Sequence, residues 1–385
     1  MEESTVNDRY ARSEFIIWNE QIEAPDASAA SEAQRRWDAV AKPIDGLGRL
    51  EKLVTKIAGI QKSADVSIDP AALIILCADN GIVEEGVSQS GQEVTAAVAR
   101  SMAAGNSSAC RMAREAGVDV LPVDIGVAGD LSDVPEFTWK KKAGLLRRRI
   151  RSGTGNFLKE SALTPEEAFS AIETGTQLAK ECAAAGSRIL FTGEMGIGNT
   201  TTSAALTAAL LNERAENVCG RGAGLDDAGM QRKCEVVSAG LKKYGYGRVP
   251  LTDPEEVFRA LCSFGGLDIA GLAGVFIGGA MSRLPVVIDG VISAVAALIA
   301  ARLVPACRAY QLASHAGRER SCMLLTEALE LTPVISADLA LGEGTGALLL
   351  KPLLEMALAV YRSETGFGNL AMEPYERYDS GKERT

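Results

Sequence analysis

The chain has 385 residues, of which 47% are hydrophobic and 23% charged, as in a globular protein with one large and one small domain, or two comparable ones. Its formal charge of −10 (40 Lys and Arg against 50 Asp and Glu) argues against a broad nucleic-acid-binding surface, so no nucleic-acid partner is expected. Eight scattered cysteines without a C-x-x-C pair and a single histidine argue against a metal site or a disulfide framework, and favour a reduced, cytoplasmic protein.

The N-terminal part of the chain predicts helices without strands. Within residues 1–25, only a short amphipathic segment around Ile16–Trp18 is expected. Helices are predicted over about 28–40, where Ala, Glu, Gln and Arg predominate, and over about 48–62. We therefore expect residues 1–65 to form a small helical subdomain on which about 350–385 pack, and residues 66–349 to form the α/β catalytic domain.

From residue 71 onward, predicted strands and helices alternate. The apolar run Ala71–Ala78 predicts a strand covered on both faces, as in a parallel sheet. Further strands are predicted at 118–126, 188–192 and 285–290, and the main helices at 93–104, 107–116, 165–185, 199–211, 228–244, 257–264, 268–281, 291–301, 318–329 and 347–360. The apolar helix 291–301 is shorter than the about 20 residues of a membrane span, so no span is expected. The alternation predicts an α/β fold, a three-layer Rossmann-like domain with a mainly parallel sheet, beside the small helical subdomain.

Two loops share one pattern, in which an apolar run is followed by Gly-Glu, further glycines and a helix. They are Thr192–Thr202 and Leu341–Ala347, which carry Glu194 and Glu343. A carboxylate among glycines can approach a ligand closely, and in a partly dry pocket its pKa rises, so that it can act as a base. Alternatively, Glu343 is an acidic residue that stabilises a helix N-terminus.

Phosphate is the anion that glycine-rich loops before helices usually bind. The segment 196–201 is the best candidate for such a site, with Lys233 or Arg232 as the accompanying cation. The P-loop pattern is absent and G-x-G-x-x-G is not met in the first βα turn, so ATP hydrolysis and dinucleotide oxidoreduction lose support. Acid–base chemistry is left to carboxylates, with four candidates: Glu194, Glu343, Asp289 and Asp79.

A series of short motifs along the chain resembles the sequence of a known family. They include Lys42-Pro43 with Gly46–Glu51, Ala78–Gly81 with Glu85–Ser88, Gly153–Asn156, Gly193–Thr201, Gly222–Gly224, Gly265–Ile269, Leu284–Gly290, Ser314-His315 and Leu341–Ala347. Over roughly residues 24–361 the chain resembles the nicotinate-nucleotide:dimethylbenzimidazole phosphoribosyltransferases. The resemblance implies that nicotinate mononucleotide gives its phosphoribosyl group to a benzimidazole nitrogen, with inversion at the sugar carbon and release of nicotinate.

The resemblance also implies roles for individual residues. Glu343 would be the general base, Glu194 would help to hold the base, and Ser90 would line the base pocket. The phosphate of the nucleotide would be bound by Gly196, Ile197, Gly198, Asn199, Thr200, Thr201 and Lys233, with Met195, Asp289, Gly342 and Gly344 as further substrate-binding residues. No cofactor and no metal are implied. A homodimer is expected, for which the glycine-rich helix 268–281 could supply an interface.

Some positions depart from the family pattern. Asn80 stands where histidine is frequent, and Ala97 and Val98 stand where a glutamine commonly contacts the base. Another benzimidazole, a purine or a phenol is therefore an alternative acceptor, and a non-catalytic nucleotide-binding relative is a further alternative. The charged runs 140–142 and 147–149 are not typical of the family, and a solvated face is the preferred interpretation.

Overall fold

The computed structural model describes residues 2–377, and side chains from residue 11 onward. Its contacts divide the chain into two units, one from residues up to 23 together with 69–350, the other from 24–68 together with the described part of 351–385. The end of the predicted C-terminal segment, residues 378–385, lies outside the described residues. No helix in the part of the chain that the structure describes has the length and apolarity to cross a lipid bilayer.

A six-stranded sheet organises the larger unit, and the predicted α/β fold is confirmed. Its strands are β1 (Ala71–Ala78), β2 (Val118–Gly126), β3 (Leu146–Arg147), β4 (Ile189–Met195), β5 (Val286–Ile288) and β6 (Gln311–Ala313). Their order is β3-β2-β1-β4-β5-β6, and every pair is parallel. All residues of β1 are buried, because helices cover both faces of the sheet.

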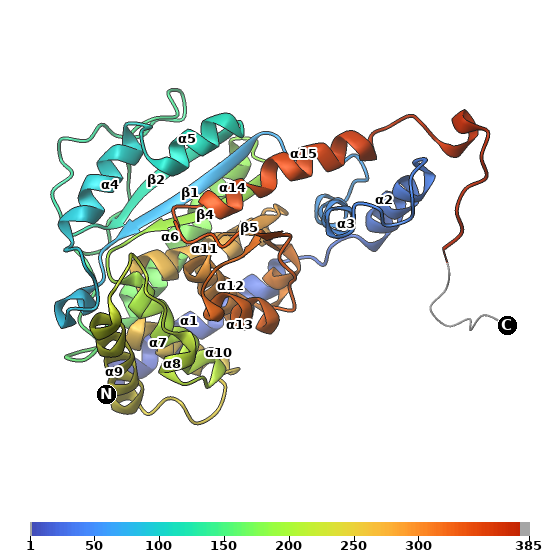
Figure 1. Ribbon diagram of the computed structural model, residues 1–385. Coiled ribbons are helices and arrows are strands. Elements are labelled where there is room, and N and C mark those ends of the chain that lie inside the picture. The colour runs from blue at the N-terminus through green and yellow to red at the C-terminus, as the bar shows by residue number, and fades with distance from the viewer. Residues whose placement is uncertain (1, 378–385) are drawn as a thin grey trace. The chain divides into compact units, whose positions relative to one another are not determined.

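The helices form the outer layers of this unit (Figure 1). One face is covered by α4 (Glu93–Ala103), α5 (Ser108–Glu115) and α14 (Thr345–Leu348), the other by α6 (Pro165–Ala184), α11 (Leu267–Met281) and α12 (Val291–Leu303). Besides α1, described below, this unit contains η1 (Gly81–Glu85), α7 (Asn199–Leu211), α8 (Ala215–Val218), α9 (Asp227–Tyr244), α10 (Pro254–Phe264), η2 (Pro305–Tyr310), β7 (His315–Ala316), α13 (Arg320–Ala328) and β8 (Ile335–Ser336).

Helix α11 packs inside the protein, contrary to the expectation that it supplies an interface. Its residues Leu267 to Ala280 are all buried. A Cβ on Gly274 would lie 1.9 Å from the carbonyl oxygen of Ile172, and one on Gly175 would lie 1.8 Å from that of Gly271. The glycines therefore permit the backbones of α6 and α11 to touch. The apolar surface of α11 is buried within the chain.

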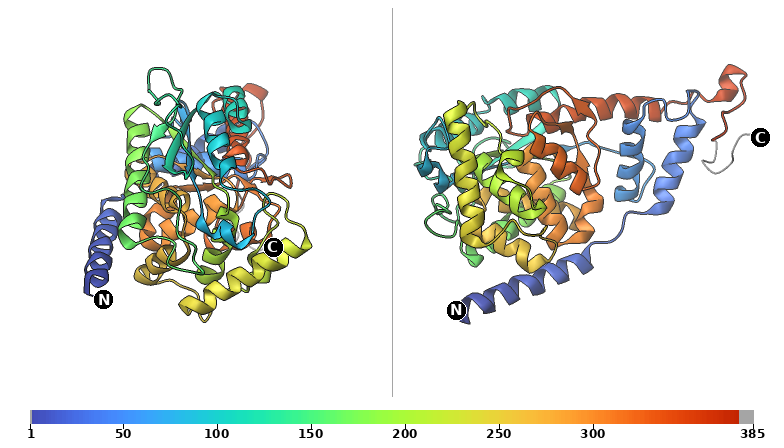
Figure 2. Two further views of the ribbon diagram at one scale, coloured as in Figure 1. Left: turned by 90° about the vertical axis from the view of Figure 1, so that its left-hand side faces the viewer. Right: turned by 60° about the horizontal axis from the view of Figure 1, so that its bottom comes forward.

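Helix α1 (Glu2–Gln21) corrects two predictions. It is long rather than a short segment around residue 16, and it belongs to the α/β unit rather than to the helical one. Phe15 is 3% exposed, with ring centroids 5.6 Å from Phe258 and 5.9 Å from Phe169, and Trp18 stacks on Phe169 at 5.7 Å. Figure 2 shows α1 running along the outside of this unit. This aromatic packing, which sequence periodicity does not reveal, holds the helix in place.

The smaller unit is helical. It contains α2 (Ala27–Ala39), α3 (Arg49–Gln61), most of α15 (Leu350–Tyr361) and η3 (Phe367–Leu370). Trp37 is fully buried with its ring centroid 4.9 Å from that of Tyr361, whose hydroxyl donates to the carbonyl oxygen of Ala64 at 2.8 Å. An ion pair of 2.8 Å joins Lys42 to the buried Glu51. The two contacts of Tyr361 join the last helix to the early part of this unit, and the ion pair holds the start of α3 to the segment before it.

Candidate active site

A cavity of about 330 Å³ lies where the loops after β1, β4 and β5 meet. Most of the predicted site residues line it: Ser90, Glu194, Met195, Gly196, Ile197, Gly198, Asn199, Thr200, Asp289, Gly342 and Glu343. Thr201, Lys233 and Gly344 do not. The carboxyl ends of parallel strands share one edge of a sheet, which is why loops distant in sequence converge here.

Glu343 has a left-handed backbone with φ of 59°, between Gly342 (φ 83°) and Gly344 (φ 87°). A Cβ at Gly342 would lie 2.8 Å from Glu194 Oε1, and one at Gly193 would lie 2.6 Å from the carbonyl oxygen of Glu343. Glycine on both loops therefore permits the two Gly-Glu segments to touch. The Glu343 Oε2 atom accepts a hydrogen bond of 3.3 Å from the N–H of Ala109 in the first turn of α5, where the positive end of the helix dipole favours a carboxylate.

Asp289 fixes the conformation of this Gly-Glu-Gly loop. Its Oδ2 accepts from the N–H of Gly344 at 3.1 Å, and its Oδ1 from the N–H of Ala347 at 2.9 Å. Burial raises the pKa of Asp289, and the neighbouring His315 opposes the shift. The ring of His315 packs against Gly346 and its Nδ1 lies 3.0 Å from Ser314 Oγ, as expected for a structural histidine. Asp289 thus borders the cavity while both of its oxygens hold the loop.

Glu194 belongs to a buried cluster with Asn199 and Asp268. The side-chain nitrogen of Asn199 donates to Glu194 Oε2 and, at 2.9 Å, to Asp268 Oδ2. Burial, followed by the charge of Asp268, raises the pKa of Glu194 to about 8, and burial raises the pKa of Asp268 to about 6. Glu194 is therefore mostly protonated at neutral pH and can donate a hydrogen bond. Sequence reasoning gave Asp268 no role, because nothing in its local pattern indicates which loop it faces.

The start of α7 and the loop 219–225 form a polar corner of the cavity. Lys233 is fully buried, and its Nζ donates to Thr200 Oγ1 and to the carbonyl oxygen of Gly220, each at 2.9 Å. Burial lowers the pKa of Lys233. Lys233 therefore acts on the cavity through Thr200. Sequence reasoning missed two arginines that line the cavity, Arg221 and Arg318, because they lie in loops without a phosphate-binding pattern.

The apolar wall of the cavity comes partly from α4, which contributes Val94 and Val98. Ala97 does not line the cavity, so Val98 is the departure from the family pattern that changes its wall. Asn80 is fully buried away from the wall. Its Oδ1 accepts from Thr202 Oγ1 at 2.9 Å, and its N–H donates to the carbonyl oxygen of Ile197 at 3.2 Å. Asn80 therefore supports the loop after β4.

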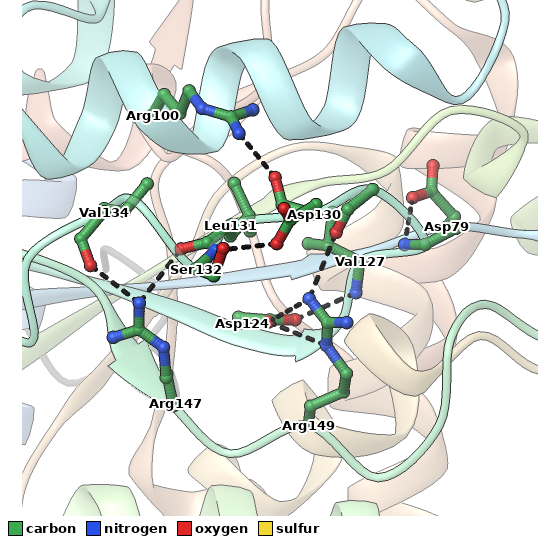
Figure 3. Close-up of polar contacts among 12 residues, drawn as sticks. Asp79, Arg100, Asp124, Val127, Asp130, Leu131, Ser132, Val134, Arg147 and Arg149 are labelled. Atoms are coloured by element: carbon green, nitrogen blue, oxygen red, sulfur yellow. Dashed lines mark hydrogen bonds and ion pairs between the residues drawn. The ribbon is translucent and has the colours of Figure 1, made fainter.

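The arginine run is more than a solvated face. Arg147 donates to the carbonyl oxygens of Leu131 (2.9 Å) and Val134 (2.6 Å), and Arg149 pairs with Asp124 at 2.8 Å. Figure 3 shows these arginines around the loop 127–136, with Arg100 on its other side. They hold the loop that follows β2. The lysine run 140–142 is exposed, in agreement with the prediction of a solvated face.

A family model described as "Phosphoribosyltransferase" matches residues 22–369. The chain belongs to this phosphoribosyltransferase family. The nicotinate-nucleotide–dimethylbenzimidazole phosphoribosyltransferase of Acetivibrio thermocellus is 41% identical over 343 residues, covering 89% of this chain and 93% of the relative. The protein of the same name from Chloroflexus aggregans is 41% identical over 335 residues, covering 87% and 91%. The crystal structure of CobT from Thermus thermophilus superposes with a TM-score of 0.81 at 36% identity, covering 90% of this chain and 99% of that one.

Membership of the phosphoribosyltransferase family confirms the resemblance drawn from the motifs. It also confirms the predicted enzyme class, a glycosyltransferase that moves a phosphoribosyl group. Family membership also argues against a dinucleotide oxidoreductase, for which the sequence lacks the G-x-G-x-x-G pattern in the first βα turn.

Proposed function

We propose that this phosphoribosyltransferase uses nicotinate mononucleotide as donor and a benzimidazole-type base as acceptor, and makes an α-ribazole 5′-phosphate for cobamide assembly. The observation that carries the proposal is the position of Glu343 and Glu194 on the wall of one cavity, beside the glycine-rich start of α7. The names of the relatives point to the same two substrates.

The reaction needs a base and little else from the protein. The nucleotide holds its pyridine ring as a cation, so cleavage of the bond to the sugar carbon leaves the electron pair on the ring nitrogen and releases nicotinate with a neutral ring. One benzimidazole nitrogen attacks the sugar carbon from the opposite face, and the proton on its other nitrogen goes to Glu343. General base catalysis of this kind contributes about 10²–10⁴-fold.

The remaining residues position the two substrates. Thr200, supported by Lys233, and the first turn of α7 would bind the 5′-phosphate, since helix N-termini favour anions. Protonated Glu194 would donate a hydrogen bond near the reacting rings, and Val94 and Val98 would cover the acceptor. Ser90, on the loop before α4, would line the acceptor side.

Replacement of Glu343 by glutamine tests the base assignment. Because glutamine cannot take a proton, we expect Glu343→Gln to lose about 10²–10⁴-fold in kcat while the Kd for nicotinate mononucleotide stays unchanged. Nicotinate release with dimethylbenzimidazole as acceptor measures kcat, and calorimetry measures Kd. Glu327→Gln, which replaces an exposed glutamate on α13, is the matched control. Full activity of Glu343→Gln would refute the assignment.

The preferred acceptor follows from a competition among dimethylbenzimidazole, unsubstituted benzimidazole, adenine and phenols. The apolar residue Val98 in the wall favours an acceptor without a polar contact from α4. Nucleotide binding without turnover of any base would favour the non-catalytic alternative.

We also propose a homodimer in the cytoplasm, as the family resemblance and the cysteine content suggest; analytical ultracentrifugation measures the mass.

A further inference from the structure

The loop between β4 and α7 is held by hydrogen bonds from neighbouring elements. Ile197 lies between Gly196 and Gly198, and glycine on each side allows this segment many backbone conformations. The N–H of Ile197 donates to Thr95 Oγ1 at 3.1 Å, and its carbonyl oxygen accepts from the N–H of Asn80 at 3.2 Å. Both backbone polar groups of Ile197 are therefore bonded to other elements, α4 and the end of β1.

Thr95 is the centre of this arrangement. It is fully buried on α4, and its hydroxyl donates to Asp79 Oδ1 at 2.6 Å. A hydroxyl has one proton, so its donation to Asp79 leaves the oxygen lone pairs for the N–H of Ile197. The other oxygen of Asp79 accepts from the N–H of Ala128 at 2.8 Å. Figure 3 shows Asp79 beside the loop 127–136. The direction of the Thr95 hydroxyl is thus set by a carboxylate that is itself fixed.

Helix α4 also carries the apolar wall of the cavity. Val94 and Val98 line the cavity on the side where we propose that the acceptor binds. Ile197 lines it on the side of the loop between β4 and α7, called the nucleotide loop below because we propose that it binds the nucleotide. Thr95 and Asp79 do not line the cavity. The bond from Ile197 to Thr95 therefore joins the two sides of the site. Without it, the bond from Asn80 would be the one that remains of these two restraints on Ile197, and the glycines at 196 and 198 would let the loop move more relative to the wall.

We propose that Thr95 and Asp79 are positioning residues of the transferase: through Ile197 they fix the nucleotide loop against the acceptor wall on α4. The assignment of the two sides rests on the proposed function, while the dependence of the loop on the Thr95 hydroxyl does not. Burial raises the pKa of Asp79, but the hydrogen bonds from Thr95 and Ala128 oppose that shift by favouring the carboxylate.

Thr95→Val removes the hydroxyl with little change of shape, and Thr95→Ser restores it. Thr176→Val is the matched control, because Thr176 is also a buried helical threonine with a bonded hydroxyl but lies away from the cavity. We expect Thr95→Val to lower kcat/KM for nicotinate mononucleotide about tenfold, equal to about 1.4 kcal/mol. Thr95→Ser and Thr176→Val should stay within about twofold of the wild type.

Hydrogen exchange in the ligand-free protein gives a second measurement that needs no turnover. We expect the amides of residues 195–199 to exchange about tenfold faster in Thr95→Val, the same factor as above, and at the wild-type rate in Thr95→Ser and Thr176→Val. If Thr95→Val fails to fold, Asp79→Asn replaces it. This substitution places an NH₂ group against either the N–H of Ala128 or the hydroxyl of Thr95, and it should give the same faster exchange. If the wild-type protein shows no turnover, the proposed function is refuted but the positioning role is not. Unchanged exchange in Thr95→Val, or equal loss of kcat/KM in Thr95→Ser, overturns the positioning role.

Discussion

Glu194 makes one contribution to the pH dependence of the stability of this protein, and Glu194→Gln should remove that contribution. The ordinary pKa of a glutamate is 4.5, whereas burial and Asp268 raise the pKa of Glu194 to about 8 in the folded protein. The folded state therefore keeps a proton that the unfolded chain loses. The contribution of Glu194 to stability is complete below pH 4.5 and is lost as the pH rises through about 8.

The size of the effect follows from the two pKa values. When the folded state binds one proton more than the unfolded state, the free energy of unfolding falls by about 1.4 kcal/mol for each unit by which the pH rises. Between about pH 5 and pH 8 the loss is on the order of 4 kcal/mol, an upper value because one side of Glu194 borders the cavity, where water screens the charge. Glutamine carries no charge and still offers an oxygen to Asn199, so the variant lacks this term.

Urea unfolding of wild type and Glu194→Gln at several pH values between 5 and 8 measures the difference. The wild type should lose stability relative to the variant as the pH rises, and contributions common to both proteins cancel. Glu327→Gln, which removes an exposed carboxylate, should follow the wild type. Parallel pH profiles for wild type and Glu194→Gln would refute the argument, because Glu194 would then titrate alike in the folded and unfolded states.

Three further substitutions test the loops around Glu194 and Glu343. Asp289→Asn places an NH₂ group against one of two backbone N–H donors, so urea unfolding should show a loss of about 1–3 kcal/mol; an unchanged midpoint would contradict the anchoring role. Gly344→Ala adds a crowded Cβ at φ 87°, so nicotinate release should fall, whereas Gly245→Ala, at φ 76° with open space around it, should keep its activity; equal effects would indicate strain alone. Lys233→Met leaves Thr200 without its donor, so KM for the nucleotide should rise about tenfold, which steady-state kinetics measures; an unchanged KM would exclude Lys233 from phosphate binding.

The larger elements could be predicted because their sequences carry the pattern of the fold. The run Ala71–Ala78 is apolar throughout since β1 is covered on both faces, and the helix that begins after Thr164 has a complete capping box. Helix α1 was missed for the opposite reason. Its residues have weak helical periodicity, and its place is decided by aromatic contacts with Phe169 and Phe258, which are far away in sequence.

The site was predictable in part. Local glycine patterns identified Glu194 and Glu343, and the structure places both on one cavity wall. Asp289 was predicted to bind substrate, but its two oxygens hold backbone N–H groups of the loop around Glu343. Thr95 was given no role, because a threonine inside a helix carries no motif and its hydroxyl acts on a loop 102 positions later.

The sequence alone determined the strand–helix alternation, the family and the two glycine-bounded carboxylates, since each depends on residues that are neighbours in the chain. Only the tertiary structure decided which carboxylate is protonated, which one serves as an anchor, and which helix holds the loop between β4 and α7. The pKa of Glu194 depends on burial and on Asp268, which is brought near by the packing of α11 on the sheet. Proximity of this kind arises from packing between distant segments, and no local pattern of residues encodes it.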